Sequence, residues 1–143
     1  HIPKLVMAKG QYFTYSGKAK FKHLVYPLPN KGSLGLHLCI NYADEVKFGP
    51  DINIVDVEDY DVNLDLKEKF VNSVKRYFPK LEADNLSPAY AGIRPKLSAE
   101  GVDFCIQTSD IHGLEGLINL FGMESPGMTS SLAIGKYVKD ILE

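Results

Sequence analysis

The sequence Gly122-Met123-Glu124-Ser125-Pro126-Gly127-Met128-Thr129 decides how the fold is expected to end. The apolar run 117–121 precedes it, and a pattern typical of a helix, 130–142, follows it. The order strand, glycine-bearing turn and helix brings backbone N–H groups and a helix N-terminus towards an anion or the polar edge of a cofactor. The same turn also fits an ordinary strand-to-helix connection in a packed domain. A short motif of this kind leaves both interpretations open.

Particular residues of this turn favour a defined backbone path. Gly122 and Gly127 allow positive φ angles and close approach of the backbone to a neighbour. Pro126 stiffens the turn because its ring fixes φ. We expect Thr129 or Ser130 to cap the following helix, since a hydroxyl oxygen can accept a hydrogen bond from an N–H group of the first turn.

The composition is that of an ordinary globular domain. The chain has 143 residues, of which 45% are hydrophobic and 24% charged, and this length suits one domain with a sizeable core. The net charge of −2 at pH 7 argues against nucleic acid as the main partner. We find no apolar run of membrane-spanning length and no signal-peptide pattern. We therefore expect a protein of the cytoplasm, or one peripheral to an inner membrane.

The cysteines and histidines do not form a metal-binding pattern. Cys39 and Cys105 lie far apart, each in a hydrophobic run, and neither has a Cys or His at the spacing of metal ligands. The four histidines lack the HxH and HExxH spacings. We expect no metal, and free thiols in a reducing compartment, with a single disulfide as the alternative.

Short strand patterns separated by polar turns fill the first part of the chain. We expect strands at 5–8, 11–15, 23–28, 34–40 and 46–49. Within 34–40, two sets of residues alternate and therefore face opposite sides of a strand: Leu34, Leu36, Leu38 and Ile40 on one side, and Gly35, His37 and Cys39 on the other. The tight turns between these runs predict an antiparallel sheet.

One amphipathic helix is predicted at 63–78, where apolar residues recur at helical spacing. Asn63 or Asp65 can cap it, and Pro79 ends it. Further strands are expected at 88–97, 102–107 and 117–121, with a loop at 108–113. We therefore predict an α+β domain, with an antiparallel sheet of about six or seven strands and this helix packed on it. A terminal strand-turn-helix follows.

Arg94 and Tyr90 are the first candidate site residues. Arg94 lies between apolar neighbours, where an unpaired guanidinium is costly. A carboxylate ligand held by a bidentate fork would pair it, and so would a structural Asp or Glu. Tyr90 precedes Arg94 by four residues, an even spacing that places both on one face of a strand. Tyr90 also fits an ordinary half-buried position on a sheet.

His37 is the candidate acid or base. It lies on the opposite strand face from the leucines of 34–40, facing either a cleft or solvent. Histidine changes charge near neutral pH and can accept a proton from a hydroxyl group. His112 is expected to be structural.

Five segments, in this order, are similar to the C-terminal part of FAD-dependent oxidoreductases of the D-amino-acid-oxidase superfamily: Lys9–Tyr12, Tyr26–Pro29, Phe48–Asp51, Tyr90–Leu97 and Asn119–Thr129. The resemblance covers nearly the whole chain, and its two most specific pieces are Tyr90–Leu97 and Asn119–Thr129. Within the superfamily, the chain is most similar to the branch of L-2-hydroxyglutarate dehydrogenases and oxidases.

This resemblance implies roles for the candidate residues. Arg94 would grip the substrate carboxylate, with Tyr90 and Tyr26 facing the substrate, although core packing also fits Tyr26. His37 would be the catalytic base, because this branch has a similar Gly-x-His segment. FAD would be contacted by Lys9, for which a simple strand-end charge is the alternative, and by the turn residues Gly122, Met123, Ser125, Pro126, Gly127, Met128 and Thr129.

The resemblance also implies that the chain is a fragment. No G-x-G-x-x-G motif follows a strand, and in this superfamily that motif holds the pyrophosphate near the N-terminus. We expect a substrate-binding sheet domain at 1–114 and, at 115–143, the terminal strand-turn-helix of an otherwise missing FAD-binding domain. FAD would not be held by this chain alone. The exposed apolar surface would be covered by the missing domain or by a second copy.

The implied function is oxidation of a small 2-hydroxy acid, L-2-hydroxyglutarate, to 2-oxoglutarate in the full-length protein. One alternative is an FAD-dependent oxidase or dehydrogenase of amino acids, which needs the arginine but no base for a hydroxyl. Another is a non-catalytic binding module that keeps the sheet.

Overall fold

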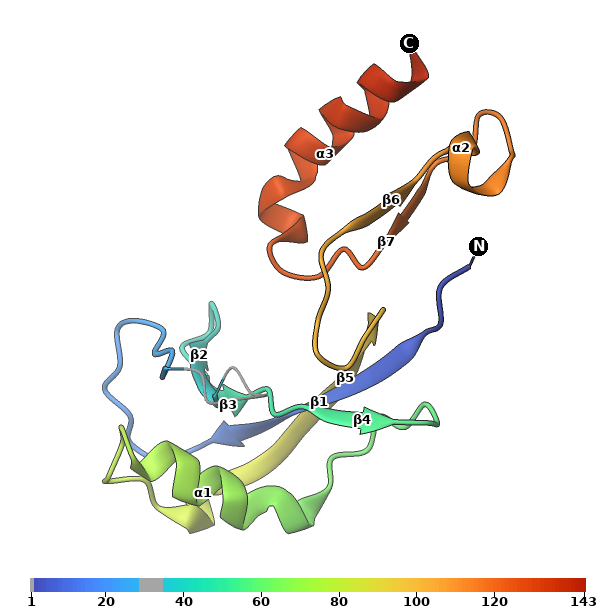
Figure 1. The fold of residues 1–143 in the computed structure, drawn as a ribbon. Helices are drawn as coiled ribbons and strands as arrows, with labels where there is room; N and C mark the ends of the chain where they lie inside the picture. The colour runs from blue at the N-terminus through green and yellow to red at the C-terminus, as the bar shows by residue number, and fades with distance from the viewer. Residues whose placement is uncertain (1, 29–34) are drawn as a thin grey trace. The chain divides into compact units, whose positions relative to one another are not determined.

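The computed structural model describes residues 2–28 and 35–143, which divide between two compact units (Figure 1). The sheet unit is Met7–Arg94, and the terminal unit combines the N-terminal segment up to Val6 with Pro95–Glu143. The division falls earlier than the boundary expected between residues 114 and 115. The physical reason is that the segments expected as strands at 102–107 and 117–121 pair with each other.

The sheet unit is built around one long strand, β1 (Val6–Tyr15). The short strands β3 (Val46–Gly49) and β4 (Asn53–Val55) both pair with β1 in the antiparallel sense, and β2 (His37–Ile40) pairs with β3. The eleven-residue strand β5 (Leu86–Lys96) also pairs with β1. The α+β class with antiparallel sheets is confirmed, but the strands of the described residues form a five-stranded and a two-stranded sheet rather than one.

Strands β3 and β4 are two halves of one interrupted strand. Phe13 pairs with Phe48 and Lys9 with Asn53, so between these pairs three residues of β1 face four on the other side. One extra residue is the definition of a β-bulge. Asp51 lies in the bulge, where its carboxylate accepts a hydrogen bond of 2.8 Å from the N–H group of Gln11.

Gly10 shows why β1 stays unbroken where two strands were expected. A Cβ atom on Gly10 would lie 2.9 Å from Cβ of Pro50, so only glycine lets the bulge approach β1 this closely. The strands expected at 5–8 and 11–15 are therefore one strand, and the irregularity lies in its partner.

The predicted amphipathic helix is confirmed and covers one face of this sheet. It consists of a short 3₁₀ turn, Leu64–Leu66, and α1 (Lys67–Lys75). Asn63 is the cap, because its side-chain oxygen accepts from the N–H group of Asp65 at 2.9 Å. The Phe70 ring of α1 lies 4.7 Å from the Phe13 ring of β1. The buried core consists of Phe13, Tyr15, Leu36, Leu38, Val46, Phe48, Phe70, Val71, Val74, Leu81 and Leu86. A second short 3₁₀ turn, Ala83–Asn85, precedes β5.

The region between β1 and β2 has less strand than the sequence predicted. The prediction of a strand at 23–28 is wrong, since only an isolated bridge between Val25 and Leu38 forms there. Pro27 lacks the N–H group that a continued ladder would use. Of the strand expected at 34–40, Leu34 lies outside the described residues. The predicted alternation is confirmed further on, because Leu36 and Leu38 are buried in the core and Ile40 packs against it.

The terminal unit is a hairpin followed by a helix. Strands β6 (Cys105–Gln107) and β7 (Asn119–Phe121) pair in the antiparallel sense, and the short α2 (Ser109–His112) replaces the loop expected between them. The last helix, α3 (Gly127–Leu142), begins earlier than predicted. Thr129 and Ser130 are therefore not caps. Pro126 occupies the cap position, and the Ser130 hydroxyl donates to the Pro126 carbonyl at 2.9 Å within the first turn.

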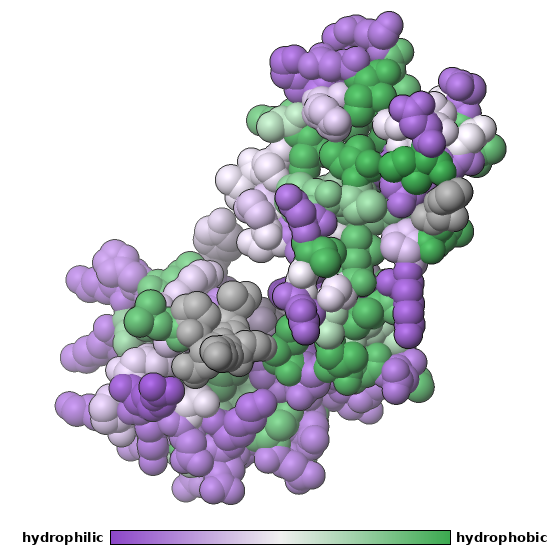
Figure 2. All heavy atoms as spheres, in the orientation of Figure 1, coloured by the Kyte–Doolittle hydropathy of each residue, from purple (hydrophilic) through white to green (hydrophobic). Residues whose placement is uncertain are grey.

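The terminal unit exposes apolar side chains on α3 and around the hairpin. Met128 and Leu132 are each 89% exposed, and Figure 2 shows hydrophobic atoms at the surface over this unit. Other large exposed apolar residues here are Leu114, Leu117, Leu120, Tyr137, Ile141 and Leu142. In the part of the chain that the structure describes, helices are too short or too polar to cross a membrane. Both cysteines are free thiols, as predicted.

Candidate functional site

The alternation of β1 defines a second face of the sheet, opposite α1. Gln11, Phe13 and Tyr15 are buried, whereas Tyr12 and Thr14 between them are half-buried. Because successive side chains of a strand point to opposite faces, Tyr12 and Thr14 point away from the α1-covered core. We call this side of the sheet the open face.

Two tyrosines stack on the open face. The rings of Tyr12 and Tyr90 have centroids 4.6 Å apart and planes inclined by 23°. Tyr90 is therefore held against β1 by its ring as well as by the strand pairing. Arg94 follows four residues later on β5 and is exposed, so an even spacing places it on the same side of the strand as Tyr90.

A second stack lies beside the first. The rings of Tyr26 and His37 have centroids 3.9 Å apart and an interplanar angle of 15°. His37 pairs with Gly49 across β2 and β3. A Cβ atom on Gly49 would lie 2.7 Å from the Tyr12 ring. Because Gly49 has no side chain, the Tyr12 ring can occupy the space beside it. Gly49 pairs with His37, so Tyr12 lies next to the position of His37.

The electrostatics of Tyr12 show which groups surround its hydroxyl. Burial, helped by the neighbouring Tyr90 and Cys39, raises the pKa of Tyr12 to about 12, while the positive charge of Arg94 acts in the opposite direction. The hydroxyl is therefore protonated at neutral pH and can donate a hydrogen bond. Burial also raises the pKa of the Cys39 thiol.

Lys47 completes the open face. It pairs with Thr14 on β1 and with Cys39 on β2, which are both residues of this face. Its Nζ atom lies 5.4 Å from the centroid of the Tyr90 ring. This separation suits a cation–π contact.

The structure brings together the four residues that the sequence predicted for substrate and chemistry: Tyr26, His37, Tyr90 and Arg94. Sequence reasoning placed Cys39 on the face of His37, but it missed Tyr12 and Lys47. The available signal for Tyr12 was its alternation with Phe13 and Tyr15. Lys47 carried no comparable signal, because its place depends on strand pairing.

Lys9 has structural partners in the sheet unit. Its side chain is buried, its ammonium group forms an ion pair with Asp59, and it donates to the Asp61 carbonyl oxygen at 2.6 Å. The hydrogen bond from Lys9 lowers the pKa of the Asp59 carboxyl group. Lys9 thus anchors the loop that enters α1, from the face opposite Tyr12. Its predicted contact with FAD stays a prediction.

The predicted cofactor turn is fixed by contacts inside the terminal unit. Gly122 has φ +68°, and a Cβ atom there would lie 2.9 Å from Cδ1 of Leu97. The ammonium group of Lys96 lies 3.0 and 2.7 Å from the two carboxylate oxygens of Glu124. Both of these side chains are largely buried. Lys96, the last residue of β5, and Leu97, which follows it, therefore hold both ends of the segment 122–124.

The N-terminus of α3 is open to an external acceptor. Among the described residues, no side chain caps this helix, because Pro126 occupies the cap position. Met128, in the first turn, is 89% exposed. Free N–H groups of a first helical turn favour an acceptor or a negative charge.

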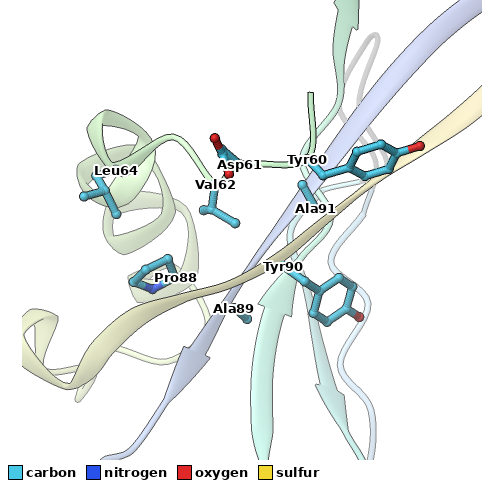
Figure 3. Close-up of a pocket in the computed structure, with 8 residues that line it drawn as sticks. All are labelled: Tyr60, Asp61, Val62, Leu64, Pro88, Ala89, Tyr90 and Ala91. Atoms are coloured by element: carbon cyan, nitrogen blue, oxygen red, sulfur yellow. The ribbon is translucent and has the colours of Figure 1, made fainter. Parts of the chain in front are cut away.

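An open pocket lies at β5, apart from most of the predicted site residues. Figure 3 shows Pro88, Ala89, Tyr90 and Ala91 along β5, facing the segment that carries Tyr60, Asp61, Val62 and Leu64. Only Tyr90 is shared with the open face. Arg94 and His37 do not line this pocket, so we give more weight to the open face, where the cations and hydrogen-bonding groups meet. Groups of His, Cys, Asp or Glu able to hold a metal are absent from the described parts of the chain.

Comparison with known proteins identifies a family over almost the whole chain. The family described as "FAD dependent oxidoreductase" matches residues 1–141. The chain is 45% identical, over 96% of its length, to the mitochondrial L-2-hydroxyglutarate dehydrogenase of Arabidopsis thaliana. It is 25% identical, over 98% of its length, to a glycerol 3-phosphate dehydrogenase of Caloramator mitchellensis. These alignments cover 32% and 29% of the two relatives, so the chain spans about a third of their length.

A solved structure supports the fold. The dithionite-reduced L-alpha-glycerophosphate oxidase of Mycoplasma pneumoniae, with FAD bound, is similar to this chain with a TM-score of 0.76. The similarity covers 98% of this chain and 37% of the oxidase, at 22% sequence identity. At that identity the similarity concerns the fold alone.

Proposed function

This chain belongs to the FAD dependent oxidoreductase family, and from that premise we propose that its sheet unit binds the substrate of a larger flavoenzyme. The proposed reaction is the oxidation of L-2-hydroxyglutarate to 2-oxoglutarate. One observation carries this proposal: two pairs of residues from distant parts of the sequence, Tyr26 with His37 and Tyr90 with Arg94, lie around Tyr12 on the open face. The 45% identity to an L-2-hydroxyglutarate dehydrogenase supports the choice of substrate.

In this proposal Arg94 binds the carboxylate next to the reacting carbon. A guanidinium offers two parallel N–H donors that match a carboxylate. The exposure of Arg94 on β5 leaves it accessible within the sheet unit. The stacked rings of Tyr12 and Tyr90 form a wall beside it. The protonated hydroxyl of Tyr12 can donate a further hydrogen bond to the same anion.

His37 accepts the proton of the substrate hydroxyl at a ring nitrogen. Oxidation of a 2-hydroxy acid removes that proton together with a hydride from the adjacent carbon, so a base beside the hydroxyl is required. The stack with Tyr26 holds the imidazole plane in place. Tyr26 is therefore a positioning residue for His37 that also borders the substrate.

The turn from Gly122 to Thr129 fits the polar part of a flavin. Support comes from the first turn of α3, which has no side-chain cap among the described residues. Gly122, Met123, Ser125, Pro126, Gly127, Met128 and Thr129 are the residues that would hold FAD. When bound, FAD supplies the hydride acceptor. The role of this chain is to bind the substrate, orient it and receive its hydroxyl proton.

The apolar surface of the terminal unit has a place in the same proposal. Exposed apolar patches of this kind mark a surface that another part of a protein covers. The relatives are about three times as long as this chain. We propose that the remainder of the full-length protein covers α3 and the β6–β7 hairpin, with a second copy as the alternative.

The first experiment is an absorption spectrum of the full-length protein before and after anaerobic addition of L-2-hydroxyglutarate. We expect a flavin spectrum that bleaches on addition. A flavin that stays oxidised would reject this substrate, and glycerol 3-phosphate and amino acids would then be tested in the same way. The first of these is motivated by the names of the weaker relatives. Absence of flavin after reconstitution with FAD would favour a non-catalytic binding module.

Matched variants test the residue roles. Arg94→Ala should raise KM strongly, whereas Arg76→Ala, the other arginine, lies exposed at the end of α1 and should behave like wild type. His37→Ala should lower kcat more than it changes KM, with the exposed His23→Ala as its control. Unchanged kinetics of Arg94→Ala would reject the carboxylate role, and an unaltered kcat of His37→Ala would remove His37 as the base.

A further inference from the structure

Lys47 is a second cation on the open face with no role in the proposal so far. It lies at the centre of the sheet, paired on one side with Thr14 and on the other with Cys39. Directly opposite residues in an antiparallel pair project from the same side of a sheet. The Lys47 side chain therefore stands among the side chains that form the proposed substrate site.

The ammonium group of Lys47 is available to a further anion. Its nearest carboxylate oxygen is Oε2 of Glu45, at 3.9 Å, which is too long for a hydrogen bond. That oxygen already accepts from Nδ2 of Asn41 at 2.8 Å. Within residues 2–28 and 35–143, the structure thus gives Lys47 no hydrogen-bonded carboxylate. Its side chain is only 25% exposed, so the charge is directed across the sheet surface rather than into bulk water.

The two cations of the open face border the same pair of rings. Lys47 Nζ lies 5.4 Å from the centroid of the Tyr90 ring, which stacks on Tyr12. The charge of Arg94 acts on the Tyr12 hydroxyl. A ligand lying along these rings would therefore have one positive group near each of two separate positions. A short dianion matches this pattern better than a monocarboxylate does.

We propose that Lys47 binds the distal carboxylate of a dicarboxylic 2-hydroxy acid and so selects dicarboxylates. This inference rests on the proposed function, in which Arg94 binds the carboxylate next to the reacting carbon. A monocarboxylate in the same place would leave the Lys47 ammonium with only its long ion pair to Glu45, and without a hydrogen-bonded carboxylate, in a partly buried position. The site would then discriminate against monocarboxylates, because they provide no distal carboxylate for the Lys47 ammonium.

The test compares two substrates with variants of the full-length flavoprotein. L-2-Hydroxyglutarate carries the distal carboxylate, and L-2-hydroxyvalerate has a methyl group in its place. For Lys47→Met we expect the ratio of kcat/KM between these substrates to fall about 10- to 100-fold, the effect of one charged hydrogen bond. The loss should lie in KM for hydroxyglutarate. Lys47→Arg should restore much of the ratio, because it keeps the charge.

Two controls separate this role from a structural one. Lys69→Met removes an exposed lysine from α1, on the other side of the sheet, and should leave the ratio unchanged. Arg94→Lys should lower kcat/KM for both substrates together. Flavin content and the thermal unfolding midpoint of each variant establish that it is folded. If Lys47→Met is misfolded, Lys47→Gln replaces it as a smaller polar change.

The outcomes distinguish this inference from the proposed function. If the wild type oxidises L-2-hydroxyglutarate and the Lys47 variants keep the wild-type ratio, Lys47 does not bind the distal carboxylate. An equal loss with both substrates would also overturn the inference, because it would show a general effect on the site. If the wild-type flavoprotein is not reduced by L-2-hydroxyglutarate, the proposed function and this inference are both wrong.

Discussion

Removing the charge of Lys96 should loosen the turn 122–129, which is proposed to contact FAD, and destabilise the protein. Lys96 ends β5, and Glu124 lies in the turn between β7 and α3. The Nζ atom of Lys96 lies 3.0 and 2.7 Å from the two carboxylate oxygens, and the side chains are 8% and 17% exposed. In Lys96→Met the Glu124 carboxylate keeps its charge but loses its partner in a poorly hydrated place.

The magnitude follows from this burial. Breaking a buried ion pair by removing one partner costs about 3–5 kcal/mol, most of it from the uncompensated charge that remains. Because Glu124 keeps some contact with water, we expect the low end, about 3 kcal/mol. Replacing both partners, in Lys96→Met with Glu124→Met, leaves no orphaned charge and should recover most of the lost stability.

The assay is urea denaturation of the full-length flavoprotein, with flavin release and loss of secondary structure followed together. The matched control is Lys136→Met, which removes an ion pair of 2.6 Å to Asp140 on the exposed surface of α3. An exposed pair of this kind contributes at most about 0.5 kcal/mol. The reasoning is refuted if Lys96→Met is no more destabilising than Lys136→Met, or if the double variant is as unstable as the single one.

Three further predictions concern other parts of the chain. Gly122→Ala should destabilise the terminal unit by about 1–2 kcal/mol through its positive φ alone, and by more because of Leu97; a denaturation midpoint equal to wild type would contradict this. The lowered pKa of Asp59 implies a stability contribution from its pairing with Lys9 that is complete above the unfolded pKa of about 4 and lost as pH falls through the lower folded pKa. Asp59→Asn should therefore weaken the decrease in the free energy of unfolding as the pH falls below about 4. If that decrease is unchanged in the variant, the Lys9–Asp59 pair does not cause it. In an absorbance titration, Tyr12→Phe should remove one tyrosine ionisation near pH 12; if the missing transition lies near pH 10 instead, Tyr12 is not shielded as described.

Periodicity was sufficient for the features that depend on local burial. The apolar spacing of 63–78 predicted α1, because one helical stripe must face the sheet. The alternation around Leu36 and Leu38 placed His37 on the opposite face, because strand side chains alternate. Both predictions needed only the chain near the residue concerned.

Features that depend on partners distant in sequence were beyond this reasoning. Lys47 belongs to the open face because β3 pairs with both β1 and β2, and no local pattern fixes that register. The bulge between β3 and β4 was hidden for the same reason. The start of α3 was mispredicted because a hydroxyl was expected to cap it, whereas Pro126 takes that position and Ser130 bonds back to it.

The alternation of side chains along β1 separates the packed core from the proposed substrate site within a single strand. Phe13 packs on α1 through Phe70, while its neighbour Tyr12 stacks on Tyr90 across the open face. Lys9 lies four residues before Phe13 and therefore points to the same face of the sheet. This explains why Lys9 is buried against the loop at Asp59 despite its charge. Substitutions of β1 residues that point towards α1, such as Phe13, should therefore act on folding. Substitutions of those on the open face, such as Tyr12, should act on the proposed substrate binding. The two sets of side chains share a backbone but face different surroundings, so each surface can vary with little effect on the packing of the other.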